Sequence, residues 1–187
     1  MFRHLVAAFA LLPALARADG TLRDTMPPGE QQEVHGFAEI RLGALGVTAV
    51  GHPTTLQTGT ALEGAVGLGF GAFDVGFVSR FGALSARGNL ESQRTFACGP
   101  EVAFRRPIGP ATFRVGLSPT YAVTTDGTVT HGRMGAELLV QTLFQFVDSE
   151  RPVWRAGVGL RAGRWVGTSG EGSGTTLGVD LIVRSWW

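Results

Sequence analysis

The chain has 187 residues, of which 44% are hydrophobic and 17% are charged, and its formal net charge at pH 7 is +1. This near neutrality gives no indication of nucleic acid or of an anionic surface as a partner. Cys98 is the only cysteine, which excludes an internal disulfide. The chain also has no run of about 18 uninterrupted apolar residues, so a helical membrane protein is excluded.

Residues 1–18 predict a secretory signal peptide. Arg3 and His4 give a basic start, residues 5–15 form a short apolar run, and Ala16-Arg17-Ala18 is a small-x-small cleavage site. An N-terminal anchor helix is the alternative, but eleven residues are too few, because a spanning helix needs about 20. We expect cleavage after Ala18, with residues 19–32 forming a periplasmic lead-in. The residue directly after the cleavage site is Asp19 and not cysteine, so a lipoprotein anchor is not indicated.

From residue 33 onward the sequence alternates with a period of two residues, which predicts strands. We expect eight of them, at residues 34–42, 62–70, 73–81, 96–104, 113–121, 134–146, 154–162 and 177–187. Most have nine residues, close to the about 9–11 that a tilted strand needs to cross a bilayer. The stretches between them have 19, 2, 14, 8, 12, 7 and 14 residues, so long and short ones alternate. This rhythm is typical of an up-and-down barrel with tight turns on one rim and longer loops on the other.

Each predicted strand has one apolar face and one charged face. The apolar face carries no charged residue and includes Ile40, Val66, Leu117 and Leu160. The opposite face carries twelve charges: Glu39, Arg41, Glu63, Asp74, Arg80, Glu101, Arg114, Glu137, Arg155, Arg161, Asp180 and Arg184. Where one strand holds two charges, both have the same parity. Because alternate side chains of a strand share a face, this supports the division independently of the apolar residues.

Either face could line the inside of a barrel. A soluble lipocalin-like barrel would place the apolar face inward, whereas a membrane barrel places it against lipid. Three observations favour the membrane barrel. The apolar face is too extensive for the narrow interior of an eight-stranded barrel, and glycines on the charged face leave volume there for arginine side chains. Aromatic residues of the apolar face gather at both strand ends, for example Phe73 and Trp154 at one and Phe81 and Tyr121 at the other. Two such girdles mark two membrane interfaces.

The chain resembles the small OmpA/OmpX-like class of outer-membrane barrels over residues 33–187. The resemblance rests on strand number, loop rhythm and the aromatic C-terminus Ser185-Trp186-Trp187, where terminal Phe is the commoner form. It implies an all-β, eight-stranded antiparallel up-and-down transmembrane β-barrel in the outer membrane of a diderm bacterium, surrounded by outer-membrane lipid. It also implies that the barrel-assembly machinery reads the last strand, through Gly178, Val179, Leu181, Val183 and Trp187.

The charged face predicts ion-pair networks in the lumen, because buried charges are costly unless they are paired. Arginine suits this role, since its planar guanidinium pairs with carboxylates through two hydrogen bonds and keeps its proton. We expect a polar plug that fills the barrel, with His35 as a hydrogen-bonded member rather than a ligand. A narrow gated pore, opened when an ion pair switches partners, is the alternative; a wide channel would need more strands.

A lipid-modifying enzyme is a further alternative, since some barrels of this class carry Ser, His and an acid near the outer rim. The residues of these types near that rim are His52, Ser85, Ser92, Asp126, His131 and Glu171. A nucleophile needs a base within hydrogen-bond reach, and no local motif ties a serine to either histidine. We therefore expect no enzyme and no cofactor. No cluster has metal-ligand spacing, so a metal site is not supported.

Two other features of the sequence bear on the barrel. The predicted outer loops could bind a surface ligand of unknown identity, but they are rich in Gly, Thr and Ser rather than in the Trp, Tyr and Arg of most binding surfaces. Pro100 and Pro119 fall inside predicted strands. Because proline cannot donate a ladder hydrogen bond, each should mark a bulge or a missing bond.

Overall fold

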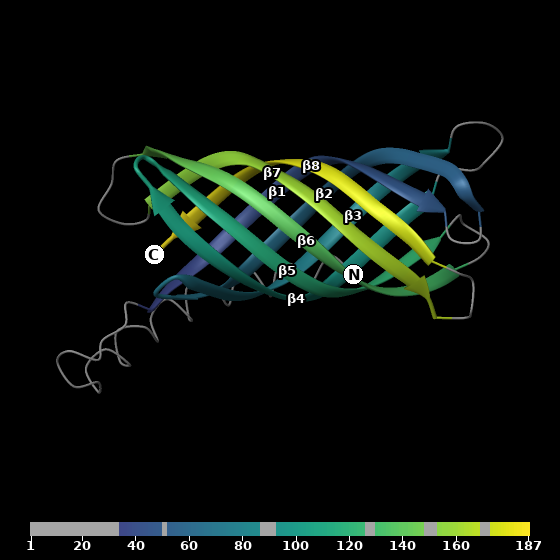
Figure 1. Ribbon diagram of the computed structural model, residues 1–187, viewed down its shortest axis with the longest axis horizontal. Helices are drawn as coiled ribbons and strands as arrows, with labels where there is room; N and C mark the ends of the chain where they lie inside the picture. The colour runs from purple at the N-terminus through teal and green to yellow at the C-terminus, as the bar shows by residue number, and fades with distance from the viewer. Residues whose placement is uncertain (1–33, 50–51, 87–92, 126–129, 148–152, 169–172) are drawn as a thin grey trace, which may run out of the picture.

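The computed structural model describes residues 34–49, 52–86, 93–125, 130–147, 153–168 and 173–187, and these form eight strands. The strands are β1 (Val34–Ala49), β2 (His52–Phe70), β3 (Phe73–Ala86), β4 (Gln93–Ile108), β5 (Ala111–Thr125), β6 (Thr130–Val147), β7 (Val153–Gly167) and β8 (Ser173–Trp186). They run side by side at a common tilt in Figure 1. Across the described residues no helix is long and apolar enough to cross a membrane. The predicted signal peptide and lead-in lie outside the described residues.

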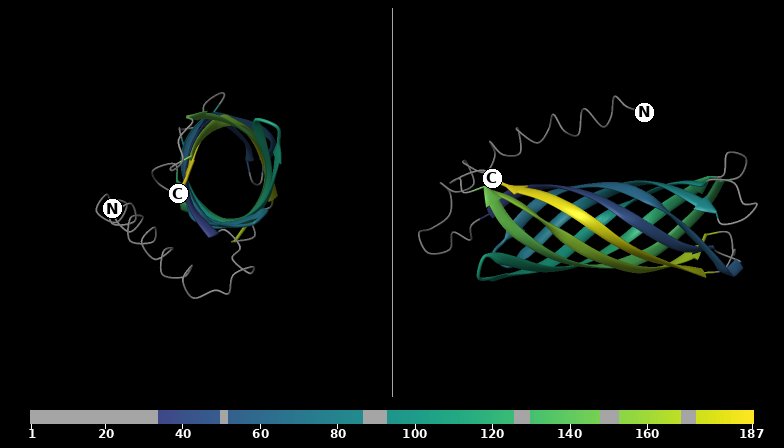
Figure 2. Two further views of the ribbon diagram at one scale, coloured as in Figure 1. Left: turned by 90° about the vertical axis from the view of Figure 1, so that its left-hand side faces the viewer. Right: turned by 90° about the horizontal axis from the view of Figure 1, so that it is seen from above.

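The eight strands form one closed barrel in which each strand pairs antiparallel with its sequence neighbours. The ring closes where β1 pairs with β8, from Phe37 opposite Trp186 to Val47 opposite Thr176, and Figure 2 shows this ring end on. The all-β, eight-stranded antiparallel fold is therefore confirmed, as is the pairing of the last strand with the first. A path of directly paired residues that starts at His35 returns to β1 at Leu45, ten residues further along. Closing a barrel requires this stagger and the strand tilt that accompanies it.

β1 begins and β8 ends at the same end of the barrel, which we call the short-turn rim. At this rim β2 turns into β3 over residues 71–72, and β4 turns into β5 over residues 109–110. Gly71 and Gly109 have φ angles of 56° and 57°. Glycine adopts this left-handed conformation at little steric cost, so it can start each two-residue turn. The opposite end, where β1 turns into β2, is called the far rim.

The strands extend further toward the far rim than the sequence predicts. The expected connection of 19 residues between the first two strands is wrong, because only residues 50–51 separate β1 from β2. Residues such as Gln57 and Thr58 instead pair with Val47 and Gly46. Backbone pairing accepts almost any residue, whereas the sequence signal for a strand needs alternating apolar and polar side chains. Thr, Gly and Ala in this part of β2 give no such contrast.

The two faces of the sheet are oriented as the alternation predicts. Among the described residues, 28 large apolar side chains are exposed, and they include Ile40, Leu117, Leu160 and Leu181, with exposed fractions of 53–64%. Eleven of the twelve predicted lumen charges are buried, and Arg155 is half-buried. Phe73 and Phe104 pack edge to face with their ring centroids 5.6 Å apart, and Phe81 packs against Phe96 at 4.9 Å. The outer wall is therefore apolar, and the interior is polar.

The two strand prolines interrupt the ladder between β4 and β5 without shifting its register. Pairing runs up to Cys98 opposite Tyr121 and resumes at Val102 opposite Leu117, so Pro100 and Pro119 face each other in the gap. A missing bond, rather than a bulge, is therefore the consequence of these prolines. The Ser118 hydroxyl donates to the carbonyl oxygen of Pro100 at 2.8 Å and bridges the gap from the lumen side.

Ring closure can be tested by a disulfide between β1 and β8. Ile40 lies directly opposite Val183, and opposed Cα atoms of antiparallel strands are about 4.5–5.5 Å apart, which is within the range of a disulfide. In a Cys98→Ala background, Ile40→Cys with Val183→Cys should cross-link on mild oxidation, as measured by reductant-sensitive gel migration. Ile40→Cys with Ala156→Cys is the control, because β8 separates these two positions. Cross-linking only in the control pair would contradict the closed ring.

Candidate functional site

The lumen is filled by a belt of charged side chains to which all eight strands contribute. The belt consists of Glu39 and Arg41 on β1, Glu63 on β2, Asp74 and Arg80 on β3, Glu101 on β4, Arg114 on β5, Glu137 and Gln141 on β6, Arg161 on β7, and Asp180 and Arg184 on β8. Each of these side chains is less than 9% exposed. Paired residues are displaced along the barrel by ten residues over one full circuit of the strands. Residues at different positions along their own strands therefore lie at the same level of the lumen.

Half of the belt is a ring of alternating arginines and carboxylates. Arg41 bonds Glu39 and also contacts Glu101 through two nitrogens, at 2.9 and 3.0 Å. Arg114 continues the ring, at 2.5 Å from Glu101 and 2.9 Å from Asp74. Arg184 closes it, at 2.5 Å from Asp74 and 2.9 Å from Glu39. Every charge in this ring thus has partners of opposite sign on both sides.

The other half of the belt lies closer to the far rim. Arg161 bonds Glu63 at 2.6 Å, Glu137 at 3.0 Å and Asp180 at 3.0 Å. The Arg80 guanidinium donates two parallel hydrogen bonds to the Glu137 carboxylate, at 2.7 and 2.8 Å. This bidentate arrangement is the strongest geometry for an arginine–carboxylate pair. Arg41 also bonds Glu63, and this contact joins the two halves into one network.

Apolar layers flank the belt on both sides. Toward the far rim the lumen holds two clusters of buried residues, Leu45, Val47, Ala61 and Leu84 in one and Ala97, Ala122 and Trp165 in the other. Toward the short-turn rim, Phe37 lies under Arg184, whose guanidinium carbon is 3.8 Å from the ring centroid. Within the described lumen, the cavity between the belt and the far rim has a volume of only about 20 Å³. The interior is therefore packed rather than open.

Glycines on the inner face make room for these long side chains. A Cβ atom added to Gly163 would lie 2.6 Å from the Glu137 Cγ atom, and one added to Gly76 would lie 2.9 Å from the Phe37 ring. Real Cβ contacts are not this short. A residue with a side chain at position 163 would therefore displace Glu137 of the belt, and one at position 76 would displace the Phe37 ring.

Arg155 differs from the other eleven predicted lumen charges. Within the described residues it makes no ion pair with a carboxylate, and its guanidinium lies 5.0 Å from the Trp186 ring centroid. Its expected place in the network stays a prediction, because among the described residues it lies close to the short-turn rim, away from the belt. Arg105, which directly follows the predicted strand at residues 96–104, pairs with Asp74 at 3.2 Å. Sequence reasoning also missed Gln141, which bonds both Arg114 and Glu39 and shares the parity of Glu137 on β6.

The residues of the predicted assembly signal lie on the closing strand. Val179, Leu181 and Val183 face outward and are 42–64% exposed, whereas Gly178 faces the lumen. Trp187 follows the end of β8, where its backbone exchanges two hydrogen bonds with Gly36, at 3.0 and 3.1 Å. Reading of this strand by an assembly machinery stays a prediction.

The structure does not bring the candidate catalytic residues together among the residues that it describes. Ser92, Asp126 and Glu171 lie outside the described residues, as does the His52 side chain. Ser85 on β3 donates its hydroxyl hydrogen to the Thr58 carbonyl oxygen at 3.1 Å, whereas His131 lies on β6, three strands away. In the part of the chain that the structure describes, no group of three or more His, Cys, Asp or Glu residues could hold a metal ion.

The fold and the lumen define a closed, eight-stranded up-and-down β-barrel with an apolar outer wall and a charged, filled interior. No family model and no curated protein matches the sequence. Among solved structures, the chain is similar to Neisserial surface protein A, with a TM-score of 0.65 and 10% sequence identity. The match covers 80% of this chain and 96% of the neisserial chain. At this identity the likeness shows the fold.

The belt predicts an asymmetry between single and paired substitutions. Glu137→Ala should lower the free energy of unfolding by about 3–5 kcal/mol, because it leaves the buried Arg80 without its bidentate partner. Arg80→Ala with Glu137→Ala should cost less than the single change, since both charges are removed. Chemical unfolding in lipid vesicles, followed by tryptophan fluorescence, measures both values. Arg164→Ala, at an exposed arginine near the far-rim end of β7, is the control and should be nearly neutral. A double variant no more stable than Glu137→Ala would contradict the network account.

Proposed function

We propose that the protein is an integral outer-membrane barrel without enzymatic activity, whose lumen is closed by the arginine–carboxylate belt. The observation that carries this proposal is the inverted distribution of side chains in a closed barrel. The outer wall exposes large apolar side chains on all eight strands, while twelve charged side chains of the described residues are buried inside. Soluble monomers rarely expose apolar patches larger than a few hundred Å², whereas a lipid-facing barrel requires such a wall.

Three further observations support the same location. The sequence predicts a signal peptide, which would export the chain from the cytoplasm. Aromatic residues near both ends of the outer wall fit the two girdles of a membrane barrel. The fold is also similar to that of Neisserial surface protein A, whose name describes it as a surface protein. These three observations are consistent with a barrel that lies in the outer membrane, with both ends of its described chain on the periplasmic side.

The closed lumen suggests a role that does not depend on transport through the barrel. Each belt arginine contacts at least one carboxylate of another strand, so opening a path for water requires several ion pairs to part together. The rigid barrel would then serve as a membrane anchor that presents the far-rim hairpins at the cell surface. In these hairpins the Thr175 main-chain nitrogen donates to the Thr48 hydroxyl at 2.8 Å, which ties β8 to β1 above the belt.

A narrow gated pore is the second candidate, and one contact favours it. The Arg80 Nη1 atom is 2.7 Å from a Glu137 oxygen and 3.7 Å from a Glu63 oxygen. A small movement would therefore exchange one carboxylate partner for the other. Such a switch changes the path along the lumen without leaving a charge unpaired.

Conductance distinguishes the two candidates. The purified barrel in a planar lipid bilayer should be electrically silent over a wide voltage range if the belt is a plug. Arg80→Ser with Glu137→Ser, which removes one complete ion pair from the far-rim half of the belt, should produce small conductance steps. Discrete, voltage-dependent openings of the unaltered protein would instead establish the gated pore. Heat-modifiable gel migration of each sample verifies that the barrel is folded.

Placement of the outer wall in lipid predicts the effect of a charge on that wall. Leu117 is 53% exposed and lies near the middle of β5. Leu117→Arg should cost about 2–4 kcal/mol in unfolding free energy, because the charge would lie near the bilayer midplane. Thr130→Arg, at an exposed far-rim position, is the matched control and should cost about 0–1 kcal/mol. Equal and small costs, measured by unfolding in vesicles, would indicate an outer wall in water.

A further inference from the structure

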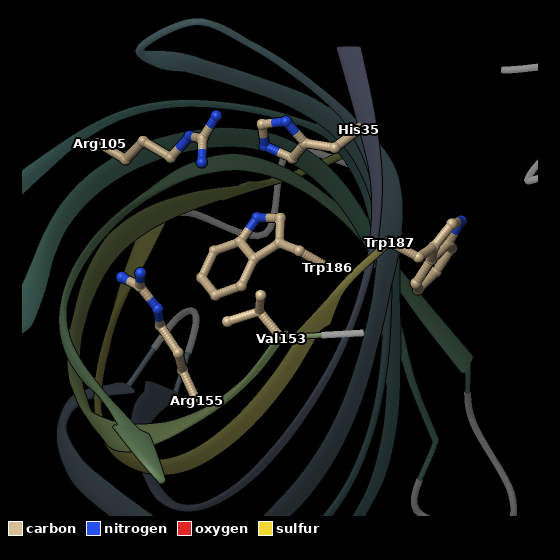
Figure 3. Close-up of a pocket in the computed structure, with 6 residues that line it drawn as sticks. All are labelled: His35, Arg105, Val153, Arg155, Trp186 and Trp187. Carbon is tan, nitrogen blue, oxygen red and sulfur yellow. The ribbon is translucent and has the colours of Figure 1, made fainter. Parts of the chain in front are cut away.

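The lumen has a second compartment at the short-turn rim, separate from the charged belt. It is a cavity of about 180 Å³ lined by His35, Arg105, Val153, Arg155, Trp186 and Trp187 (Figure 3), and we call it the vestibule. Phe37 and Trp186 belong to one apolar cluster that adjoins the belt, since the guanidinium carbon of Arg184 lies 3.8 Å from the Phe37 ring centroid and 4.6 Å from the Trp186 ring centroid. None of the six described lining residues is acidic, although two of them are arginines.

Two hydrogen-bond donors in the vestibule have no acceptor among the residues that the structure describes. Trp186 is only 7% exposed, and among the described residues its indole Nε1 atom has no hydrogen-bond partner. The Nε atom of Arg155 is likewise buried without an acceptor in the described structure. Figure 3 shows the indole nitrogen of Trp186 turned toward Arg105 and His35, with Arg155 at the other end of the indole ring. Buried donors in native proteins nearly always have an acceptor, so these two donors are available for a partner such as a bound group or an ordered water molecule.

The charges of the described lumen point to the same conclusion. The six belt carboxylates are matched by the five belt arginines together with Arg105, which pairs with Asp74. Two further lumen arginines remain: Arg133 is buried near the far rim, and Arg155 stacks on Trp186 at 5.0 Å from the ring centroid. Stacking on an aromatic ring is a weaker compensation for a positive charge than a carboxylate or phosphate partner. Among the side chains of the described residues, the vestibule therefore carries an excess positive charge beside an apolar layer.

We propose that the vestibule binds a small oxyanion, which accepts hydrogen bonds from Trp186 Nε1, Arg155 and Arg105. Planar guanidinium groups match the oxygens of carboxylates and phosphates, and the indole N–H adds a donor from a third direction. The cavity is smaller than the about 300–1,000 Å³ of sites for drug-sized ligands. It accommodates a free anion of a few heavy atoms or the phosphate of a lipid headgroup that reaches over the rim beside Trp187.

Inorganic phosphate is the first probe for this site. The refolded full-length mature protein, in a zwitterionic detergent, is titrated with phosphate and followed by ³¹P NMR line broadening and by calorimetry. Saturable binding is expected. Trp186→Phe keeps the ring and removes only the N–H, and it should weaken binding by about tenfold, as expected for the loss of one hydrogen bond to a charged ligand. Arg155→Gln should weaken binding by at least as much, and Arg155→Lys should restore part of it, because lysine keeps the charge but loses the planar fork.

The control is Arg164→Gln, which removes an exposed arginine near the far-rim end of β7, away from the vestibule, and should leave phosphate binding unchanged. A second arm repeats the titration in phosphatidylcholine nanodiscs with and without phosphatidylglycerol. Competition by phosphatidylglycerol that disappears in Arg155→Gln would identify a lipid phosphate as the occupant, whereas phosphate binding of equal strength in the lipid-free detergent and in both kinds of nanodisc would identify a free anion. The proposal is overturned if neither phosphate nor phosphatidylglycerol binds. It is also overturned if Trp186→Phe and Arg155→Gln bind like the unaltered protein while migrating as folded barrels.

Discussion

The packing of charged side chains in the lumen depends on the ion pairs of Arg41. This side chain reaches carboxylates from three strands, Glu39 on β1, Glu63 on β2 and Glu101 on β4, and it joins the two halves of the belt. A fully buried arginine is acceptable only when its charge and its donors are matched, because desolvation of an unpaired ion costs several kcal/mol. The same requirement applies to every other member of the belt. The sheet must therefore close with the stagger that brings these residues together.

The outer wall and the belt are two consequences of one strand pattern. Alternate residues of each strand face opposite sides, so a strand that presents leucine and phenylalanine outward presents its charges and glycines inward. A register slip of one residue would put arginine on the apolar wall and phenylalanine among the carboxylates. Buried ion pairs add little net stability over well-packed apolar residues. Their larger effect here is to exclude alternative registers, since each wrong pairing would leave charges without partners.

Much of the fold could be predicted from the sequence because it depends on local alternation. The parity of Glu39 with Arg41, and of Asp180 with Arg184, already assigns the inner face, and Gly71 and Gly109 mark the tight turns. The far-rim halves of the strands could not be predicted, because Thr, Gly and Ala pair through the backbone without any alternation of polarity. The prolines at positions 100 and 119 each predicted a local defect, but only the register shows that they share one gap in the ladder.

The belt was predictable in composition but not in its contacts. Which arginine meets which carboxylate depends on the ten-residue stagger around the barrel, and that quantity leaves no trace in the sequence of one chain. Arg155 and Arg105 illustrate the point, since both carry charge on or near the lumen face and only Arg105 reaches a belt carboxylate. The vestibule follows from the same geometry, because an arginine beyond the reach of the belt is left beside an aromatic residue with an unused donor.

The central claim is that the apolar face of each strand lies in lipid. Spin labels attached to cysteines at Leu177, Val179, Leu181 and Val183, in the vesicle-embedded protein without Cys98, test it most directly. The account predicts that all four labels collide more often with oxygen, which dissolves in lipid, than with a water-soluble nickel chelate. More frequent collisions with the nickel chelate at these positions would place the outer wall in water and would contradict the account.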